Sequence, residues 1–222
     1  ELESLGYRWA YRVVDSYSFG LPQRRERVFI VASADTQPED ILLVDDNPIS
    51  RPATCVGTLA HGFYWTEGRG GLGWAVDAVP TLKNGSTIGI ASPPAVLLPD
   101  LTIVTPSIRD AEVMQGFDRD WTEPADAVER SSARWSLIGS AVSVPVSRWL
   151  GERIKSPGQF EPAGLGAFPE SGKLPRTAYG SKRAGRFAVP LSSDPVGTRP
   201  PHLVSVLERP ARPLSAKAAA GF

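Results

Sequence analysis

Residues 6–33 read GYRWAYRVVDSYSFGLPQRRERVFIVAS, and this stretch decides the fold expected for the start of the chain. Tyr7 to Val14 is rich in aromatic and β-branched residues, which favour a strand. After a loop from Ser16 to Pro22, Arg27 to Ala32 forms a continuous apolar run typical of a buried strand. A loop this short favours antiparallel neighbours, because parallel strands need a longer crossover. We therefore predict an antiparallel pair of strands.

Charged residues lead directly into the second strand, in the order Gln23, Arg24, Arg25, Glu26, Arg27. Guanidinium groups this close together are costly unless anions or acidic partners meet them. The run is either a phosphate and base contact at a strand entrance or an ordinary solvated charge cluster. Alternation along the strand predicts Arg25 and Arg27 on one side and Arg24 and Glu26 on the other.

Composition restricts the class of protein. The chain has 222 residues, of which 41% are hydrophobic, enough for a core, and its 21 Gly and 21 Pro predict many loops. No apolar run reaches membrane-spanning length and no signal segment precedes the first strand, so we expect a soluble, cytoplasmic protein without a membrane partner. The single Cys fits a reducing compartment.

Charge is distributed unevenly along the chain. The net charge is zero, which argues against a general polyanion binder. Residues 34–150 carry 8 Lys and Arg against 15 Asp and Glu, whereas residues 151–222 carry 11 against 5. The basic tail is either a phosphate-facing surface or simply solvated.

The first residues predict more protein upstream. Leu2 and Leu5, followed by Gly6, have the pattern of a last helical turn with a glycine cap. A single turn is not stable alone, because helix nucleation is costly. We therefore expect a longer helix that begins before Glu1.

Residues 34–104 differ in character from the two strands, with an acidic stretch followed by Gly-rich and aromatic pieces. We predict a small irregular domain or long insertion, and such a span is usually functional. Lys83-Asn84-Gly85-Ser86 is a tight turn whose side chains can reach phosphates or base edges. The alternative is a hairpin tip without a ligand.

Helical patterns return after residue 104. Ser107 with Asp110 predicts a capped helix to Met114 that Gly116 ends. Further helices are predicted over residues 131–138 and 145–154, the latter with one apolar face formed by Val146, Trp149, Leu150 and Ile154. Beyond Ser156 we expect an extended arm with turns and a terminal helix over residues 215–220.

Three segments resemble, in the right order, the eighth, ninth and tenth motifs of the DNA cytosine-5 methyltransferases: residues 22–29, 105–117 and 138–146. The catalytic Pro-Cys pair and the glycine-rich cofactor loop of that family do not occur in these residues. The resemblance implies the C-terminal portion of an α/β, Rossmann-like S-adenosylmethionine-dependent methyltransferase with a small irregular target-recognition domain. The implied divisions are the end of the catalytic domain (1–33), the target-recognition region (34–104), the return to the catalytic domain (105–155) and a basic, Pro/Gly-rich C-terminal extension (156–222).

The resemblance also implies the reaction, which is methyl transfer from S-adenosylmethionine to C5 of a flipped-out cytosine in double-stranded DNA, in a setting such as restriction–modification. Because the catalytic Cys is absent, we expect this segment alone to be inactive. Its implied partners are DNA and either a missing N-terminal half or a complementary subunit. The chain is alternatively the recognition subunit of a two-chain methyltransferase, or an inert DNA-binding remnant.

Residue roles follow from the matched motifs. Arg27 resembles the residue that holds the O2 edge of the cytosine, Arg25 the residue that braces the catalytic acid, and Gln23 a residue of the site's wall. Arg109 resembles a scaffold residue, which can pair with Glu112 three positions on.

Cofactor contacts are implied for Ser140, Ala141 and Val142. Ser140 stands where the family usually has Asn, and its hydroxyl offers fewer hydrogen bonds. DNA contacts are expected from Arg24, Lys83, Asn84 and Ser86.

Other candidate sites are weak. Cys55 follows Thr54 rather than Pro, and lies beyond the first matched motif, so it is not expected to be the nucleophile. Gly68 to Gly73 formally fits a dinucleotide loop, but Pro80 interrupts any following helix. With two His and one Cys, no metal site is predicted.

Overall fold

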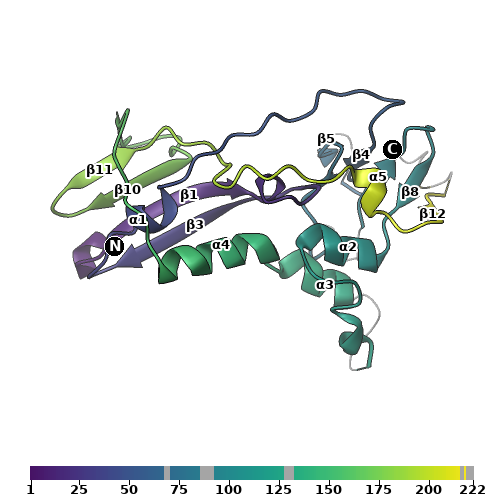
Figure 1. Ribbon diagram of the computed structural model, residues 1–222, viewed down its shortest axis with the longest axis horizontal. Helices are drawn as coiled ribbons and strands as arrows, with labels where there is room; N and C mark the ends of the chain where they lie inside the picture. Colours follow the sequence, from purple (N-terminus) through teal and green to yellow (C-terminus); the bar gives the residue numbers. More distant parts are fainter. Residues whose placement is uncertain (68–70, 86–92, 128–132, 216–217, 219–222) are drawn as a thin grey trace. The chain divides into compact units, whose positions relative to one another are not determined.

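The structure is a computed structural model that describes residues 1–67, 71–85, 93–127, 133–215 and 218. The chain divides into two compact units, coloured along the sequence in Figure 1. The first unit comprises residues 1–19, 26–49 and 145–198, and the second comprises residues 20–25, 50–144 and 199–222. In the described part of the chain, no helix is long and apolar enough to cross a membrane.

The first unit contains a five-stranded antiparallel sheet in the order β3-β1-β10-β11-β9. Its strands are β1 (Arg8–Asp15), β3 (Glu26–Ser33), β9 (Gly166–Ala167), β10 (Thr177–Ser181) and β11 (Gly185–Ala188). Its helical segments are η1 (Glu3–Leu5), η2 (Ser16–Ser18), α1 (Glu39–Leu42) and α4 (Val144–Lys155), which begins at the border of the unit. The predicted antiparallel pairing of the first two long strands is confirmed, with Arg8 opposite Ser33 and Asp15 opposite Glu26.

One face of this sheet is covered by α1 and α4 (Figure 1). Ala10 and Val14 of β1 pack there with Val146 and Trp149 of α4, as the apolar spacing of that helix predicts. Ile154, also assigned to the apolar face, is 56% exposed. The predicted face therefore holds for the first half of α4 and fails at its end.

The prediction that the second strand, β3, is buried is wrong for one of its two faces. Phe29 and Val31 pack against the core, but Val28 is 58% exposed and Ile30 is 64% exposed. The cause is position, because β3 is the edge strand of the sheet and the two described helices cover the opposite face. When every residue of a strand is apolar, the sequence does not show which of the two faces of the strand packs against other residues of this chain.

The prediction of an extended arm beyond Ser156 is also wrong. Residues 166–188 supply three strands of the first sheet, and β10 lies directly beside β1, with Trp9 opposite Gly180. These strands are short and contain Gly, so their sequence carries little strand signal. β10 also forms its ladder with β1, which lies about 170 residues earlier in the chain, and no local pattern can reveal that pairing. The helix expected over residues 215–220 falls largely outside the described residues.

A buried arginine ties distant segments of this unit to the sheet. Arg12 is fully buried in β1, and its guanidinium donates to the carbonyls of Leu42, Asp45 and Ser192 and to the carboxylate of Asp46 at 2.9 Å. The carbonyl groups satisfy donors that would otherwise be desolvated without partners. Arg12 therefore fixes the segment after α1 and the segment after β11 on the same strand.

The second unit contains a five-stranded antiparallel sheet in the order β12-β8-β7-β4-β5, and a parallel pair of β2 with β6. The strands are β2 (Gln23–Arg24), β4 (His61–Phe63), β5 (Ala75–Val76), β6 (Val79–Pro80), β7 (Ala95–Leu97), β8 (Ile103–Thr105) and β12 (Arg212–Pro213). The helical segments are α2 (Ile108–Gln115), η4 (Glu123–Ala127), α3 (Ala133–Ser140) and α5 (Leu203–Val206).

The core of this unit joins its sheet to its helices. Val96 and Val104 of the sheet pack with Met114 of α2, Ile138 of α3 and Leu203 of α5. The predicted start of α2 is confirmed, since Ser107 and Asp110 form a reciprocal capping box. Gly116 ends the helix with a φ of 91°, a conformation that favours glycine.

We predict that replacing Arg12 with Met lowers the free energy of unfolding of the first unit by about 3 kcal/mol, because the carbonyls and Asp46 lose a buried partner. Urea unfolding followed by circular dichroism measures the change. The control is Arg176→Met, which breaks an exposed pair with Glu26 at 2.6 Å and costs less than about 1 kcal/mol. Equal effects of the two substitutions contradict the anchoring role of Arg12.

Candidate functional site

The side chain of Gln23 joins three segments of the second unit. It is fully buried, and its Nε2 donates to the Met114 carbonyl at 3.0 Å and to Oε1 of Gln115 at 2.6 Å. Its Oε1 accepts the backbone N–H of Leu82 at 2.9 Å. The strand entrance at β2 is thereby bonded both to α2 and to the segment after β6.

Arg25 extends this connection. Its side chain is 4% exposed and donates to the Leu82 carbonyl at 2.9 Å, the Gly139 carbonyl at 3.2 Å and the Ala141 carbonyl at 2.8 Å. Gly139 and Ala141 lie at the C-terminal end of α3, where the helix dipole favours a cation. The local geometry therefore explains how a guanidinium can be buried here.

Gln115 completes the network. This buried side chain donates to the carbonyls of Ala141 at 2.7 Å and Ile138 at 3.3 Å, and accepts from Oγ of Ser143 at 3.3 Å. We call the side chains of Gln23, Arg25 and Gln115, with the carbonyls they bind, the polar hub. The polar hub joins residues from the three segments 22–29, 105–117 and 138–146, which lie far apart in the sequence. The residues that it joins all belong to the second unit. Gln115 was not among the site residues predicted from the sequence, where its one signal is a polar residue just before a helix-ending glycine.

Arg24 and Arg27 differ from Arg25 in exposure. Both are exposed; Arg24 donates to the Trp74 carbonyl at 2.8 Å, and Arg27 to the carbonyl of Glu26 at 2.8 Å. Neither forms an ion pair within the described residues. The alternation that grouped Arg25 with Arg27 is wrong, because β2 ends at Arg24 and β3 begins at Glu26. Arg25 lies outside both strands, so strand alternation does not apply to it.

The turn after β6 is anchored within the second unit. Nζ of Lys83 lies 3.2 Å from a carboxylate oxygen of Glu67 and 3.8 Å from the centre of the Tyr64 ring. The side chain of Asn84 accepts a hydrogen bond from Ser136 at 2.5 Å. These contacts favour a structural role for Lys83, whose charge is already balanced. Ser86, the remaining predicted DNA contact of this turn, lies outside the described residues.

Gly139 explains how this turn approaches α3. A Cβ atom at Gly139 would lie 2.1 Å from the carbonyl carbon of Lys83 and 2.2 Å from the backbone nitrogen of Asn84. Real Cβ atoms do not approach this closely, so the position requires glycine. The contact joins the predicted DNA-reading turn to the segment that resembles the tenth motif.

The predicted cofactor residues lie at the end of α3, which is Ser140, and directly after it. Ser140 is exposed, Ala141 is half-buried, and Val142 is 50% exposed. The Ala141 carbonyl is occupied by the polar hub, which holds the backbone of this segment in place. An exposed aliphatic side chain beside a hydroxyl fits one wall of a site for a ligand with both apolar and hydroxyl-bearing parts.

The expected pairing of Arg109 with Glu112 is wrong. Arg109 instead pairs with Asp120 at 3.0 Å and with Glu208 at 2.7 Å. Glu112 is fully buried and pairs with Arg134 of α3 at 3.0 Å. Burial acts to raise the pKa of Glu112, but bonds from Thr122, Arg134 and the Asp120 amide outweigh it and lower that pKa. The Glu112–Arg134 pair joins α2 to α3, and Arg109 joins α2 to Asp120 and Glu208, so a structural role for Arg109 and Glu112 agrees with the geometry.

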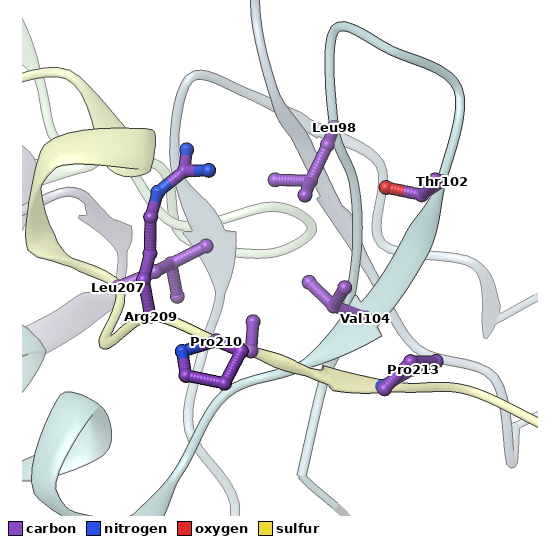
Figure 2. Close-up of a pocket in the computed structure, with 8 residues that line it drawn as sticks. Leu98, Thr102, Val104, Leu207, Arg209, Pro210 and Pro213 are labelled. Carbon is purple, nitrogen blue, oxygen red and sulfur yellow. The ribbon is translucent and has the colours of Figure 1, made fainter.

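An apolar hollow of about 610 Å³ lies between the β7–β8 hairpin and the segment after α5. Figure 2 shows Leu98, Thr102 and Val104 facing Leu207, Arg209 and two prolines across it. Thr102 donates to Asp100 at 2.6 Å. The eight lining residues include no carboxylate, imidazole or thiol, so they supply no group for acid–base or nucleophilic chemistry.

His61 is the buried titratable group of β4. Its ring is fully buried and stacks on Trp74 at 4.8 Å between centroids. Burial lowers the pKa of His61 from its ordinary value of 6.5, and the Leu59 backbone and Asp77 oppose that shift. Because the Trp74 carbonyl also accepts from Arg24, the packing of His61 supports the position of an exposed arginine.

Comparison with known proteins agrees with the motif pattern. A family model described as C-5 cytosine-specific DNA methylase matches residues 1–57. The type II methyltransferase M2.BsuMI of Bacillus subtilis strain 168 is 42% identical over 230 residues, an alignment that covers all of this chain and 58% of the relative. The chain thus spans somewhat more than half the length of that relative. No solved structure matches the chain significantly.

We predict that Gly139→Ala destabilises the second unit by about 2 kcal/mol, because the added methyl group collides with the backbone of Lys83 and Asn84. Gly151→Ala is the matched control, since Gly151 is also helical and nothing lies within 4 Å of its Cβ position. The control should stabilise α4 slightly, by up to about 1 kcal/mol. Thermal unfolding measures both, and a neutral Gly139→Ala contradicts the close approach.

Acid should destabilise the second unit through His61. Since its folded-state pKa lies below 6.5, the unfolded chain binds the proton more tightly. The contribution of His61 to the free energy of unfolding is therefore fully present above pH 6.5. It is lost as the pH falls from 6.5 through the folded-state pKa, by at most about 1.4 kcal/mol per pH unit. His61→Phe should reduce this dependence between pH 8 and pH 5 in urea unfolding; an unchanged acid sensitivity excludes His61 as its source.

Proposed function

The chain is related to the DNA cytosine-5 methyltransferases, and we propose that it is the C-terminal portion of such an enzyme, which transfers a methyl group to C5 of a cytosine in double-stranded DNA. The observation that carries the proposal is the match to M2.BsuMI along the whole of this chain. The polar hub supports it, because it joins residues from each of the three segments that resemble family motifs. By analogy with the type II relative, we propose a role in restriction–modification.

The remaining part of the enzyme is proposed to supply the chemical groups that this chain lacks. The chain spans 58% of M2.BsuMI, and its single Cys, Cys55, is exposed and does not follow a proline. A nucleophilic Cys, a catalytic Glu and a glycine-rich loop would come from the preceding polypeptide or from a partner chain. The two-chain arrangement and an inert DNA-binding remnant are the alternatives.

Arg27 is proposed to bind the flipped-out cytosine. Its guanidinium is exposed and bonded only to a neighbouring carbonyl among the described residues, so its other N–H groups can donate to the O2 atom of the base. Polarising O2 would favour attack of the enzyme's thiolate on C6, which makes C5 nucleophilic. C5 would then take the methyl group that S-adenosylmethionine supplies, with S-adenosylhomocysteine as the leaving group, and loss of the C5 proton with elimination of the thiolate would release the methylated base.

Arg25 is proposed to have a structural role rather than to react. Its three bonds to carbonyls hold residues 20–25 within the second unit. The same bonds hold the backbone that carries Ser140, Ala141 and Val142, which are proposed to contact S-adenosylmethionine. When bound, that cofactor supplies an electrophilic methyl group. The hydroxyl of Ser140 can make fewer bonds than the amide usual in the family.

The first sheet is proposed to be part of a larger, Rossmann-like sheet. Val28 and Ile30 are exposed on the edge strand β3, and they share a face with Val13 and Tyr11, which lie directly opposite them on β1. An apolar sheet face and a free strand edge both require partners. We propose that the rest of the enzyme pairs with β3 and covers this face.

Target recognition is proposed for the part of residues 34–104 that lies in the second unit. Arg24 is exposed, donates to the carbonyl of Trp74 in this region and can also donate to a phosphate or base. Asn84 and the turn that carries it are held against α3 and can present polar groups to DNA. Residues 34–49 belong to the first unit and are proposed to be structural.

The test is methyl transfer by the whole enzyme, meaning this chain joined to the part that precedes it or mixed with its partner chain. Incorporation of labelled methyl groups into duplex DNA is expected, and the 222-residue chain alone should give none. Arg27→Gln should lower kcat/KM at least about 100-fold, because it removes a charged donor aimed at the reacting base. Arg27→Lys should recover part of this loss.

Arg148→Gln is the matched control, because Arg148 is an exposed arginine on α4 that is assigned no role in the site. It should leave kcat/KM within about twofold of the original enzyme. An unaltered rate for Arg27→Gln contradicts the role of Arg27. A complete enzyme that binds DNA but never transfers a methyl group favours the inert remnant.

A further inference from the structure

A different, polar hollow lies in the first unit, at the turn between β10 and β11. Its volume is about 330 Å³, and its lining residues with polar side chains are Arg8, Gln37, Glu39, Tyr179, Ser181 and Arg183. None of these residues belongs to the polar hub or to the predicted cofactor and DNA contacts. Nothing in the proposed methyl transfer uses them.

The strand register explains why Arg8 faces this hollow. Trp9 lies opposite Gly180 and Ala10 opposite Tyr179, so the antiparallel register places Arg8 opposite Ser181. Alternation puts Arg8 on the same face as Ala10, which is buried in the core. Arg8 is the first residue of β1 and is exposed, so its guanidinium emerges where the core ends.

Arg183 reaches the same hollow from the turn. The backbone N–H of Ala184 donates to Oγ of Ser181 at 3.0 Å, and Gly185 has a φ of 87°, so the turn has a defined shape. Arg183 is exposed at its tip. Across the described part of the chain, neither Arg8 nor Arg183 has a hydrogen bond or an ion pair with another side chain.

The other walls add one opposing charge and several hydrogen-bonding groups. Tyr179 and Gln37 also line the hollow, and Nε2 of Gln37 donates to the Asp40 carboxylate at 3.4 Å. Glu39 carries the one carboxylate among the lining residues, and burial raises its pKa, an effect that Asp40 increases and Arg8 opposes. The lining residues therefore carry two positively charged guanidinium groups against one carboxylate.

We propose that this hollow, the Arg8–Arg183 pocket, binds a phosphate group. Two unpaired guanidinium groups that line one small recess match the oxygens of a phosphate, with which arginine forms paired, charge-assisted hydrogen bonds. The volume lies at the lower end of ligand sites, so it has room for a phosphate and an adjoining sugar but not for a large ligand. The phosphate comes either from the backbone of DNA or from a free phosphate compound. The proposal does not depend on methyl transfer.

Titration calorimetry of the 222-residue chain with inorganic phosphate tests the pocket directly. One saturable site is expected, and Arg183→Gln should weaken it at least about tenfold through loss of charge-assisted bonds. Lys182→Gln is the matched control, because Lys182 occupies the same turn and carries the same charge but does not line the pocket. It should change the affinity by less than about twofold.

Glu39→Gln provides a test with the opposite sign. It removes the carboxylate that repels an anion while retaining the size of the side chain, so phosphate should bind more tightly. Circular dichroism should show that the Arg183 and Glu39 variants keep the fold, since Arg183 lies on an exposed turn. Absence of a saturable site, or equal losses in Arg183→Gln and Lys182→Gln, overturns the proposal.

A second measurement identifies the source of the phosphate. Duplex DNA binding is measured across salt concentrations for the same variants. If the pocket holds a DNA phosphate, Arg183→Gln should reduce the slope of log affinity against log salt by about 0.9, and Lys182→Gln should not. An unchanged slope together with arginine-dependent binding of inorganic phosphate assigns the pocket to a free phosphate compound.

Discussion

The second unit depends on the burial of one amide and one guanidinium, Gln23 and Arg25. Each is bonded to the backbone around Leu82, so the segment after β6 is held by both. Gln23 also binds the end of α2, and Arg25 the end of α3. Because an unpaired polar group inside a core is costly, none of these segments can move alone without orphaning a partner. The hub thereby makes one body of segments that lie far apart in the sequence.

The three arginines of residues 24–27 have two different roles, one structural and one available for ligand binding, because only one of them is buried. Arg25 is buried among carbonyls, whereas Arg24 and Arg27 are exposed and keep donors free for a ligand. Arg25 lies in neither strand, because β2 ends at Arg24 and β3 begins at Glu26. The break between β2 and β3 therefore lets one cation build the scaffold while its neighbours remain available.

Features set by neighbouring residues were predictable from the sequence, and features set by distant partners were not. The β1–β3 pairing and the capping box of α2 follow from short-range patterns, and both are confirmed. The placement of β10 beside β1, the exposed face of β3 and the pairing of Glu112 with Arg134 depend on segments remote in sequence. For the site, motif resemblance located Gln23 and Arg25, but only the fold shows that Gln115 completes their network.

The most direct test of this account is amide hydrogen exchange in the 222-residue chain carrying Gln23→Leu. This change keeps the approximate size of the side chain and removes its bonds to α2 and Leu82. If the hub holds these segments as one body, exchange should accelerate together in residues 22–25, at the end of α2, around Leu82 and at the end of α3. Acceleration confined to residues 22–25 would contradict the central claim.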